Sequence, residues 1–377
     1  MVLYVAILSL GMIVGIAAEP APDPKLESKR STLVRWSVDE PVAGVVDAID
    51  RQGIEIRVDG QVIPISVPWY DVRALTPETG EYRAYRQTAE DAWRAHTRLV
   101  RGDFFSAESI YNELSGQYLW RVGPQSADVS LGLVRCRLDR GDRVDAVLPM
   151  LSWLRATTVD RFSGLRLVDE YDEAFGVFVG LPPVFGSDDR VERLGKLPGV
   201  DRITDRQRAI FGYYQLALDR SVHHTPEAQM VLDELTELVR GREGRDSGMR
   251  LIEEMVIAQA HPDSQKRLAS RAALRRRIRT DRDTWVELWA RLAIGVSLMG
   301  EGDVESNERG VIELIHVVVR LDHLSHPLSD LASQIANEYF VRTDRAQWGA
   351  ELMLEARSVS TGGLTQSILS KEHDAHE

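Results

Sequence analysis

The sequence predicts a mostly α-helical protein: a helical-hairpin repeat array, solenoid-like, preceded by a small antiparallel β-barrel or curled sheet. Two observations lead to this prediction. The stretch GIEIRVDGQVIPISVPW, residues 53–69, alternates apolar and polar side chains, which is typical of half-buried strands. Later in the chain, three pairs of helical segments each turn at a Gly-Asp dipeptide, which indicates repeated helical hairpins.

The chain begins with an apolar segment, residues 2–18, that carries no charged side chain and ends in small residues. A proline-rich linker, residues 19–30, follows it. This layout is typical of a secretory signal peptide, so we expect residues 1–18 to engage the membrane during export and to be cleaved after Ala18. An uncleaved anchor is the alternative, because 17 apolar residues lie at the lower limit for spanning a bilayer. Either way the protein is expected to be exported, to the periplasm or cell envelope.

Residues 31–75 contain four or five short strand patterns and form the predicted β module. Apolar residues alternate over 54–58 and again over 63–67. Asp59-Gly60 between them predicts a type I′ hairpin turn, because both central residues of that turn need positive φ. The module resembles a small barrel of the Sm-like or Src-homology kind. We expect Trp69 to join it to the helices.

From residue 76 to residue 357 the apolar period becomes helical, and residues 358–377 form a polar tail. Three hairpins are predicted in this region, with their bends at Gly102-Asp103, Gly141-Asp142 and Gly302-Asp303. Other helices are predicted over residues 204–220, 226–240, 248–260, 264–280 and 284–299. Residues 76–357 are therefore assigned to one helical-repeat domain.

The hairpins resemble the tetratricopeptide family. In that family a small residue in the second helix is followed four positions later by a large one, as with Ala107 and Tyr111 and with Ala146 and Met150. Ile294-Gly295 matches the Leu-Gly pair of the family's first helix. The first helices of the first two hairpins depart from the pattern, and Asn307 replaces the small residue of the third. The resemblance implies a superhelical array that binds peptides or other subunits.

Motifs that would indicate catalysis or a cofactor are absent from the sequence, which contains no phosphate loop, dinucleotide fingerprint, HExxH or GxSxG. Acidic residues cluster at 169–173, where a solvated helix end is the favoured interpretation. The alternative is an envelope-polymer hydrolase that uses carboxylates of the 169–189 region, such as Asp169, Asp172 or Asp188. The single cysteine, Cys136, excludes an intramolecular disulfide and is interpreted as a core residue. No catalytic, metal or cofactor site is predicted.

The formal net charge of −12 argues against a nucleic-acid partner. One stretch runs against this balance, because residues 266–282 hold eight Lys or Arg side chains and one Asp. Its favoured interpretation is pairing with the chain's own acids, and the alternative is an anionic partner. The candidate interaction surface consists of Arg271, Arg275, Arg276, Arg279 and Trp69.

The leading functional hypothesis is an exported, non-enzymatic scaffold that binds other proteins or peptides in the cell envelope. Stacked hairpins form extended grooves suited to such partners. A structural, self-associating envelope component is a further alternative.

Overall fold

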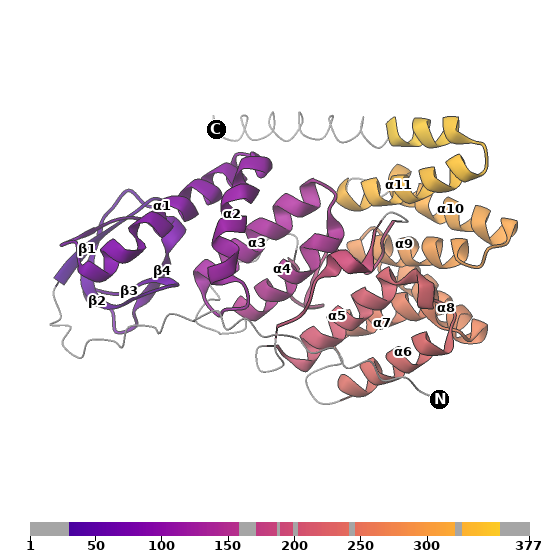
Figure 1. Cartoon of the computed structure of the whole chain (residues 1–377), viewed down its shortest axis with the longest axis horizontal. Coiled ribbons are helices and arrows are strands. Elements are labelled where there is room, and N and C mark those ends of the chain that lie inside the picture. The colour runs from indigo at the N-terminus through magenta and orange to yellow at the C-terminus, as the bar shows by residue number, and fades with distance from the viewer. Residues whose placement is uncertain are drawn as a thin grey trace, which may run out of the picture.

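A computed structural model describes residues 30–157, 171–186, 189–198, 203–240, 246–320 and 326–354. The molecule is mostly helical, with a small sheet at its N-terminal end (Figure 1). The helices follow the sheet along the long axis of the molecule, from α1 beside the sheet to α10 and α11 at the far end. None of the helices in these ranges combines the length and the apolar character needed to cross a bilayer.

The N-terminal sheet contains five antiparallel strands in the order β4-β3-β2-β1-β5. The strands are β1 (Arg30–Arg35), β2 (Val42–Asp50), β3 (Gly53–Val58), β4 (Ile65–Pro68) and β5 (Val72–Thr76). A single turn of 3₁₀ helix, η1 (Trp69–Asp71), connects β4 to β5. These two strands are the opposite edges of the sheet and do not pair with each other. The sheet is therefore open, and the closed barrel considered from the sequence does not form.

The connection between β3 and β4 is longer than the sequence predicted. Ile54 pairs with Val67, and Ile56 with Ile65, so the two alternating runs are neighbouring strands. The connection itself spans residues 59–64, with Gly60 at φ 83°. Val62 and Ile63 lie in this loop and are 87% and 78% exposed. A turn does form at Asp59-Gly60, where the Gln61 N–H donates to the Val58 oxygen at 2.9 Å. The predicted type I′ conformation was wrong, because only Gly60 has a positive φ, and four further residues precede β4.

Two helical hairpins follow the sheet. They consist of α1 (Gly80–Val100), α2 (Phe104–Tyr118), α3 (Pro124–Asp139) and α4 (Arg143–Ala156). Both predicted bends are present, with Gly102 at φ 78° and Gly141 at φ 81°, backbone conformations that glycine adopts without a Cβ penalty. Gly132 of α3 lies against the Tyr111 ring of α2, where a Cβ atom would come within 2.3 Å of the ring. This close approach fixes the spacing between the hairpins.

The helices that follow are α5 (Asp205–Leu218), α6 (Pro226–Leu238), α7 (Ser247–Ala260), α8 (Ser264–Thr280), α9 (Trp285–Met299), α10 (Val304–Arg320) and α11 (His326–Arg342). Residues 346–354 form one more helical segment. The five helices predicted over residues 204–299 lie within about two residues of α5 to α9. The third bend is also present, since Gly302 has φ 83°. Residues 171–172 form a short strand, β6, paired with β7 (Val177–Phe178). The helix end predicted at residues 169–173 is therefore wrong over its described part.

Two apolar clusters form the core. The first comprises buried residues of the sheet together with α1, α2 and α3, and the second contains those of α3 to α11. Trp69 is fully buried in the first cluster, stacked 5.0 Å from Tyr85 of α1. Its indole Nε1–H donates to the backbone oxygens of Asp50 and Arg51, at 3.1 and 2.9 Å. Trp69 thus joins the sheet to the first helix, as predicted.

The sheet is also tied to the start of α3. The N-cap of α3 is Gly123, which offers no side-chain acceptor to the first turn of the helix. Gln52, at the turn between β2 and β3, replaces it: its side-chain oxygen accepts from the Ser126 N–H at 3.0 Å. Gln125 in turn accepts from the Tyr70 N–H at 3.1 Å. These contacts tie the β2–β3 turn and η1 to the first turn of α3.

Candidate functional site

A groove of about 800 Å³ runs between the edge strand β5 and helix α1. All five residues of β5 line it, together with Trp36, which follows β1. Successive side chains of a strand point to opposite faces of the sheet. Because consecutive residues of β5 all line the groove, the groove runs along the edge of this strand and not over one face of the sheet. The groove-lining residues of α1 are Tyr82, Arg86, Gln87, Ala89, Glu90, Trp93 and Arg94.

Helix α1 runs antiparallel to β5 along this groove. Its first residues lie near Thr76, to which a short connection links them, and Trp93 lies near the opposite end of β5. Tyr82 and Arg94 are about 18 Å apart along the helix axis. The five residues of β5 span about 17 Å. The two walls are therefore matched in length over about five residues of extended chain.

Two tryptophans cross the groove at the Val72 end of β5. The rings of Trp36 and Trp93 stack with centroids 4.3 Å apart. The guanidinium of Arg73 lies over Trp36, 4.9 Å from the ring centroid. The Trp36 N–H donates to the Asp71 backbone oxygen at 2.9 Å, which continues the ladder between β1 and β5 by one residue. Trp36 is 42% exposed despite these contacts, so an aromatic surface faces solvent here.

Beyond the tryptophans the groove continues as a narrower section of about 280 Å³. Its lining includes Tyr70, Asp71, His96, Thr97 and Arg101. Trp36 and Trp93 also line it, so the wide and narrow sections meet at the tryptophan pair. The two sections lie end to end beside α1, with the stacked tryptophan pair between them.

His96 contacts Asp128, a buried acid of α3. Its Nδ1 lies 2.8 Å from the carboxylate of Asp128, and its ring stacks on Tyr70 with centroids 4.3 Å apart. Burial acts to lower the pKa of His96, but the hydrogen bond and the negative charge of Asp128 outweigh it and raise that pKa. Because a carboxylate accepts the Nδ1 hydrogen, Nε2 is the ring nitrogen left for other contacts.

Asp71 anchors the segment that carries Trp36. Its buried carboxylate accepts from Arg35 Nε at 2.7 Å and from both the backbone N–H and the hydroxyl of Ser37, each at 2.8 Å. Three donors therefore satisfy this acid, and Arg35 balances its charge. The carboxylate positions the residues on both sides of Trp36.

The candidate surface predicted on α8 is divided by the structure. Arg271 is buried and pairs with Glu301 at 2.6 Å, and Arg267 pairs with the same carboxylate at 3.0 Å. The hydrogen bond from Arg267 is the largest contribution that lowers the pKa of Glu301, to about 2. Arg275, Arg276 and Arg279 are exposed. These three arginines are the exposed members of the predicted interaction surface. The other two members, Arg271 and Trp69, are buried.

Of the acids considered for a hydrolase, Asp169 and Asp188 lie outside the described residues. Asp172 accepts hydrogen bonds from Trp285 Nε1 at 2.9 Å and from the Phe175 N–H at 3.0 Å. The contact with Phe175 closes the turn between β6 and β7, and the contact with Trp285 ties this segment to α9. Cys136 is buried, as expected, and burial raises the pKa of its thiol to about 12.

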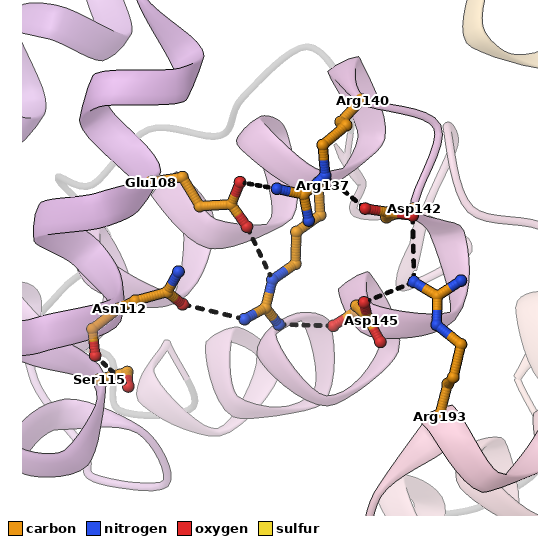
Figure 2. Close-up of polar contacts among 8 residues, drawn as sticks. All are labelled: Glu108, Asn112, Ser115, Arg137, Arg140, Asp142, Asp145 and Arg193. Carbon is orange, nitrogen blue, oxygen red and sulfur yellow. Dashed lines mark hydrogen bonds and ion pairs between the residues drawn. The ribbon is translucent and has the colours of Figure 1, made fainter.

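A second polar cluster links α2, α3, α4 and the 3₁₀ helix η3 (Val191–Leu194), and Figure 2 shows its contacts. Glu108 faces Arg137, with 3.5 Å between the closest atoms, and also contacts Arg140. Arg193 bridges Asp142 and Asp145, at 3.0 and 2.7 Å. Each of these charges has an opposite partner, and Glu108 is buried while the arginines are partly exposed. The cluster joins the two hairpins and is assigned to stability.

This cluster also explains a difference among the three bends. Asp103 and Asp303 cap their helices by accepting from the N–H groups of Ser106 and Ser306. Asp142 makes no such cap and is engaged by Arg140 and Arg193. Although burial opposes the shift, these two hydrogen bonds lower the pKa of Asp142.

No protein-family model, curated protein or solved structure matches this chain. Within the described ranges, no group of three or more His, Cys, Asp or Glu side chains is arranged to hold a metal ion. The chemistry of the groove between β5 and α1 is therefore inferred from its lining residues and their contacts.

Proposed function

We propose that this protein binds an extended peptide segment of another protein in the groove between β5 and α1. The free edge of β5, exposed along a groove of suitable volume, is the observation that supports this proposal most directly. An edge strand presents unpaired backbone N–H and C=O groups, to which an added strand hydrogen-bonds. Such addition gives affinity through the main chain and specificity through pockets for alternate side chains.

The second wall of the groove suits this mode of binding. Arg86 pairs with Glu90 and Arg94 with Asp91, so much of the charge along α1 is already balanced. The aromatic pair of Trp36 and Trp93 offers rigid apolar surface, the kind of side chain that contributes most at binding sites. A peptide beside β5 would thus meet backbone donors and acceptors on one side and an amphipathic helix on the other.

We propose the remaining organisation from the sequence. The apolar segment 2–18 supports export, with the protein acting in the cell envelope. The succession of hairpins supports a tetratricopeptide-like array behind the groove, working as a non-enzymatic scaffold. The alternative hydrolase gains no support from Asp172, whose carboxylate is already engaged by Trp285 and Phe175.

The test uses two display libraries of random segments of about ten residues, one fused to scaffold sequence at both ends and one with a free C-terminus. Both are selected on the purified protein, and the peptides obtained are synthesised and titrated by fluorescence anisotropy. Ala74→Trp fills the β5 wall and should weaken binding by about tenfold or more. Ala269→Trp, at an exposed alanine of α8, is the matched control and should bind as the unmodified protein does.

Two results contradict the proposal. The first is that neither library yields a peptide. The second is that the selected peptides bind Ala74→Trp as tightly as Ala269→Trp, which would place their site away from β5.

A further inference from the structure

We infer that the groove takes the C-terminal end of its partner polypeptide, with the free carboxylate beside His96 and Arg101. This inference rests on the proposed function and specifies its ligand. It depends on the direction of an added strand, on the charges at the two ends of the groove and on the shape of the narrow section.

The direction follows from the sheet. Every pairing in the five-stranded sheet is antiparallel, and an antiparallel neighbour continues the same pattern at the β5 edge. Such a strand enters beside Thr76 and runs toward Val72, because β5 itself runs from Val72 to Thr76. Its C-terminal residues then cross over the stacked Trp36–Trp93 pair, whose Trp36 ring is partly exposed, and reach the narrow section.

The charges along the groove differ in how they are paired. In the wide section, where the earlier residues of the peptide lie, Glu78 pairs with Arg83 and Glu90 with Arg86. Arg94 of the same section pairs with Asp91, and Arg73 lies over the Trp36 ring.

The only acid that lines the narrow section is Asp71, and Arg35 and Ser37 already satisfy its carboxylate. Arg101 lines the same section, is exposed, and forms no ion pair within the described part of the chain. Arg101 is therefore a cation of the narrow section whose charge is available to a carboxylate.

His96 adds a second donor at the same place. Asp128 lies 2.8 Å from Nδ1 and leaves Nε2 toward the narrow section, and in the protonated ring Nε2–H donates. Arg101 and His96 lie five residues apart near the end of α1 and both line the narrow section. Hydrogen bonds from charged donors to a carboxylate are among the stronger ones in proteins.

The narrow section also suits the last side chain of the peptide. Trp36, Tyr70 and Trp93 provide aromatic walls around about 280 Å³. Between Tyr82 and Arg101 the helix rises about 28 Å, which corresponds to about eight residues of extended chain. The ligand is accordingly a C-terminal segment of about eight residues ending in a large apolar or aromatic residue.

The test compares each selected peptide as the free acid, as the C-terminal amide, and as an amide with Asp in the last position. The free acid should bind at least about tenfold more tightly than either amide. Arg101→Ala should bring the ratio of free-acid to amide affinity close to one. Arg98→Ala is the matched control, an exposed arginine of the same last turn that does not line the groove, and it should preserve the ratio.

Peptides that bind equally as acid and amide would overturn the inference and leave the proposed peptide groove intact. So would tight binding of the amide carrying a terminal Asp, because the groove would then recognise a side-chain carboxylate. Absence of peptides from both libraries instead contradicts the proposed function itself. His96→Gln gives an independent check: it should reduce the acid-to-amide ratio, and an unchanged ratio would remove His96 from the carboxylate site.

Discussion

Replacing Trp69 by alanine should show whether this one side chain holds the sheet on the helices. Trp69 is fully buried, stacks on Tyr85 and donates to two backbone oxygens. Truncating a buried tryptophan costs about 3–5 kcal/mol, through lost apolar burial and the cavity left behind. That is a large part of the about 5–15 kcal/mol that stabilises a typical protein. Trp69→Phe keeps an aromatic ring against Tyr85 but loses part of the buried volume and the N–H donor, so it should cost less than Trp69→Ala, about 1–3 kcal/mol.

Urea unfolding followed by far-ultraviolet circular dichroism measures these free energies, and amide hydrogen exchange locates the loss. We expect the amides of β1 to β5 and those of α1 to lose protection together in Trp69→Ala. Trp348→Ala is the control, because that ring is 49% exposed, and it should change stability by less than about 1 kcal/mol. A change below about 1 kcal/mol in Trp69→Ala, or a loss confined to the strands with α1 unaffected, would refute the joining role.

Two further predictions concern pH. The pKa of Glu301 is lowered from 4.5 to about 2, so its stabilisation is present above pH 4.5 and is lost as the pH falls toward 2. Allowing for solvent screening, the ionised Glu301 carboxylate contributes about 1–2 kcal/mol to the free energy of unfolding. The difference in that free energy between wild type and Glu301→Gln, measured by urea unfolding, should therefore shrink as the pH falls through this window. A difference that stays constant contradicts the role of the Glu301 ion pairs. The pKa of His96 is raised above 6.5, so its pairing with Asp128 stabilises the fold fully below pH 6.5 and loses that effect as the pH rises through the raised value. The stability difference between wild type and His96→Gln should fall from about pH 5 to about pH 9, and an increase over that range would exclude the pairing.

The helices were predictable because their signals are local. Thr204 precedes α5 and forms a capping box with Gln207, and Pro226 begins α6 at the position where a proline costs no hydrogen bond. The Gly-Asp bends were equally visible, since each glycine takes a positive φ that the turn requires. Signals of this kind depend only on neighbouring residues, so tertiary packing does not change them.

In the basic helix α8, the local sequence pattern does not predict which arginines are buried. Arg267 and Arg271 point inward and Arg275 and Arg276 outward, although all four look alike in the sequence. What separates them is Glu301, which lies 34 and 30 residues further along and forms both inward ion pairs. The interpretation of pairing with the chain's own acids is confirmed for these two arginines. It is confirmed for Arg277 as well, which pairs with Glu254 at 2.7 Å.

The groove was not predicted at all, because its parts are far apart in the chain. Trp36 follows β1, Asp71 ends η1, His96 lies in α1 and Asp128 in α3. No spacing rule connects them, and each has an ordinary interpretation when read alone, as a strand-end aromatic or a solvated polar residue. One signal was available, since Trp36 and Trp93 are large aromatic residues in otherwise charged surroundings.

The two edges of the sheet differ in a way that bears on the proposed function. β4, at one edge, packs against α3 and ends in Pro68, whose nitrogen carries no hydrogen to offer a further strand. β5, at the other edge, contains no proline and faces the groove along its whole length. Natural proteins usually cover or block an exposed edge, because unpaired backbone groups attract other strands. At β5, the groove separates the edge of the strand from α1 and has room for one extended chain. The proposed peptide therefore supplies at β5 the neighbour that α3 supplies at β4.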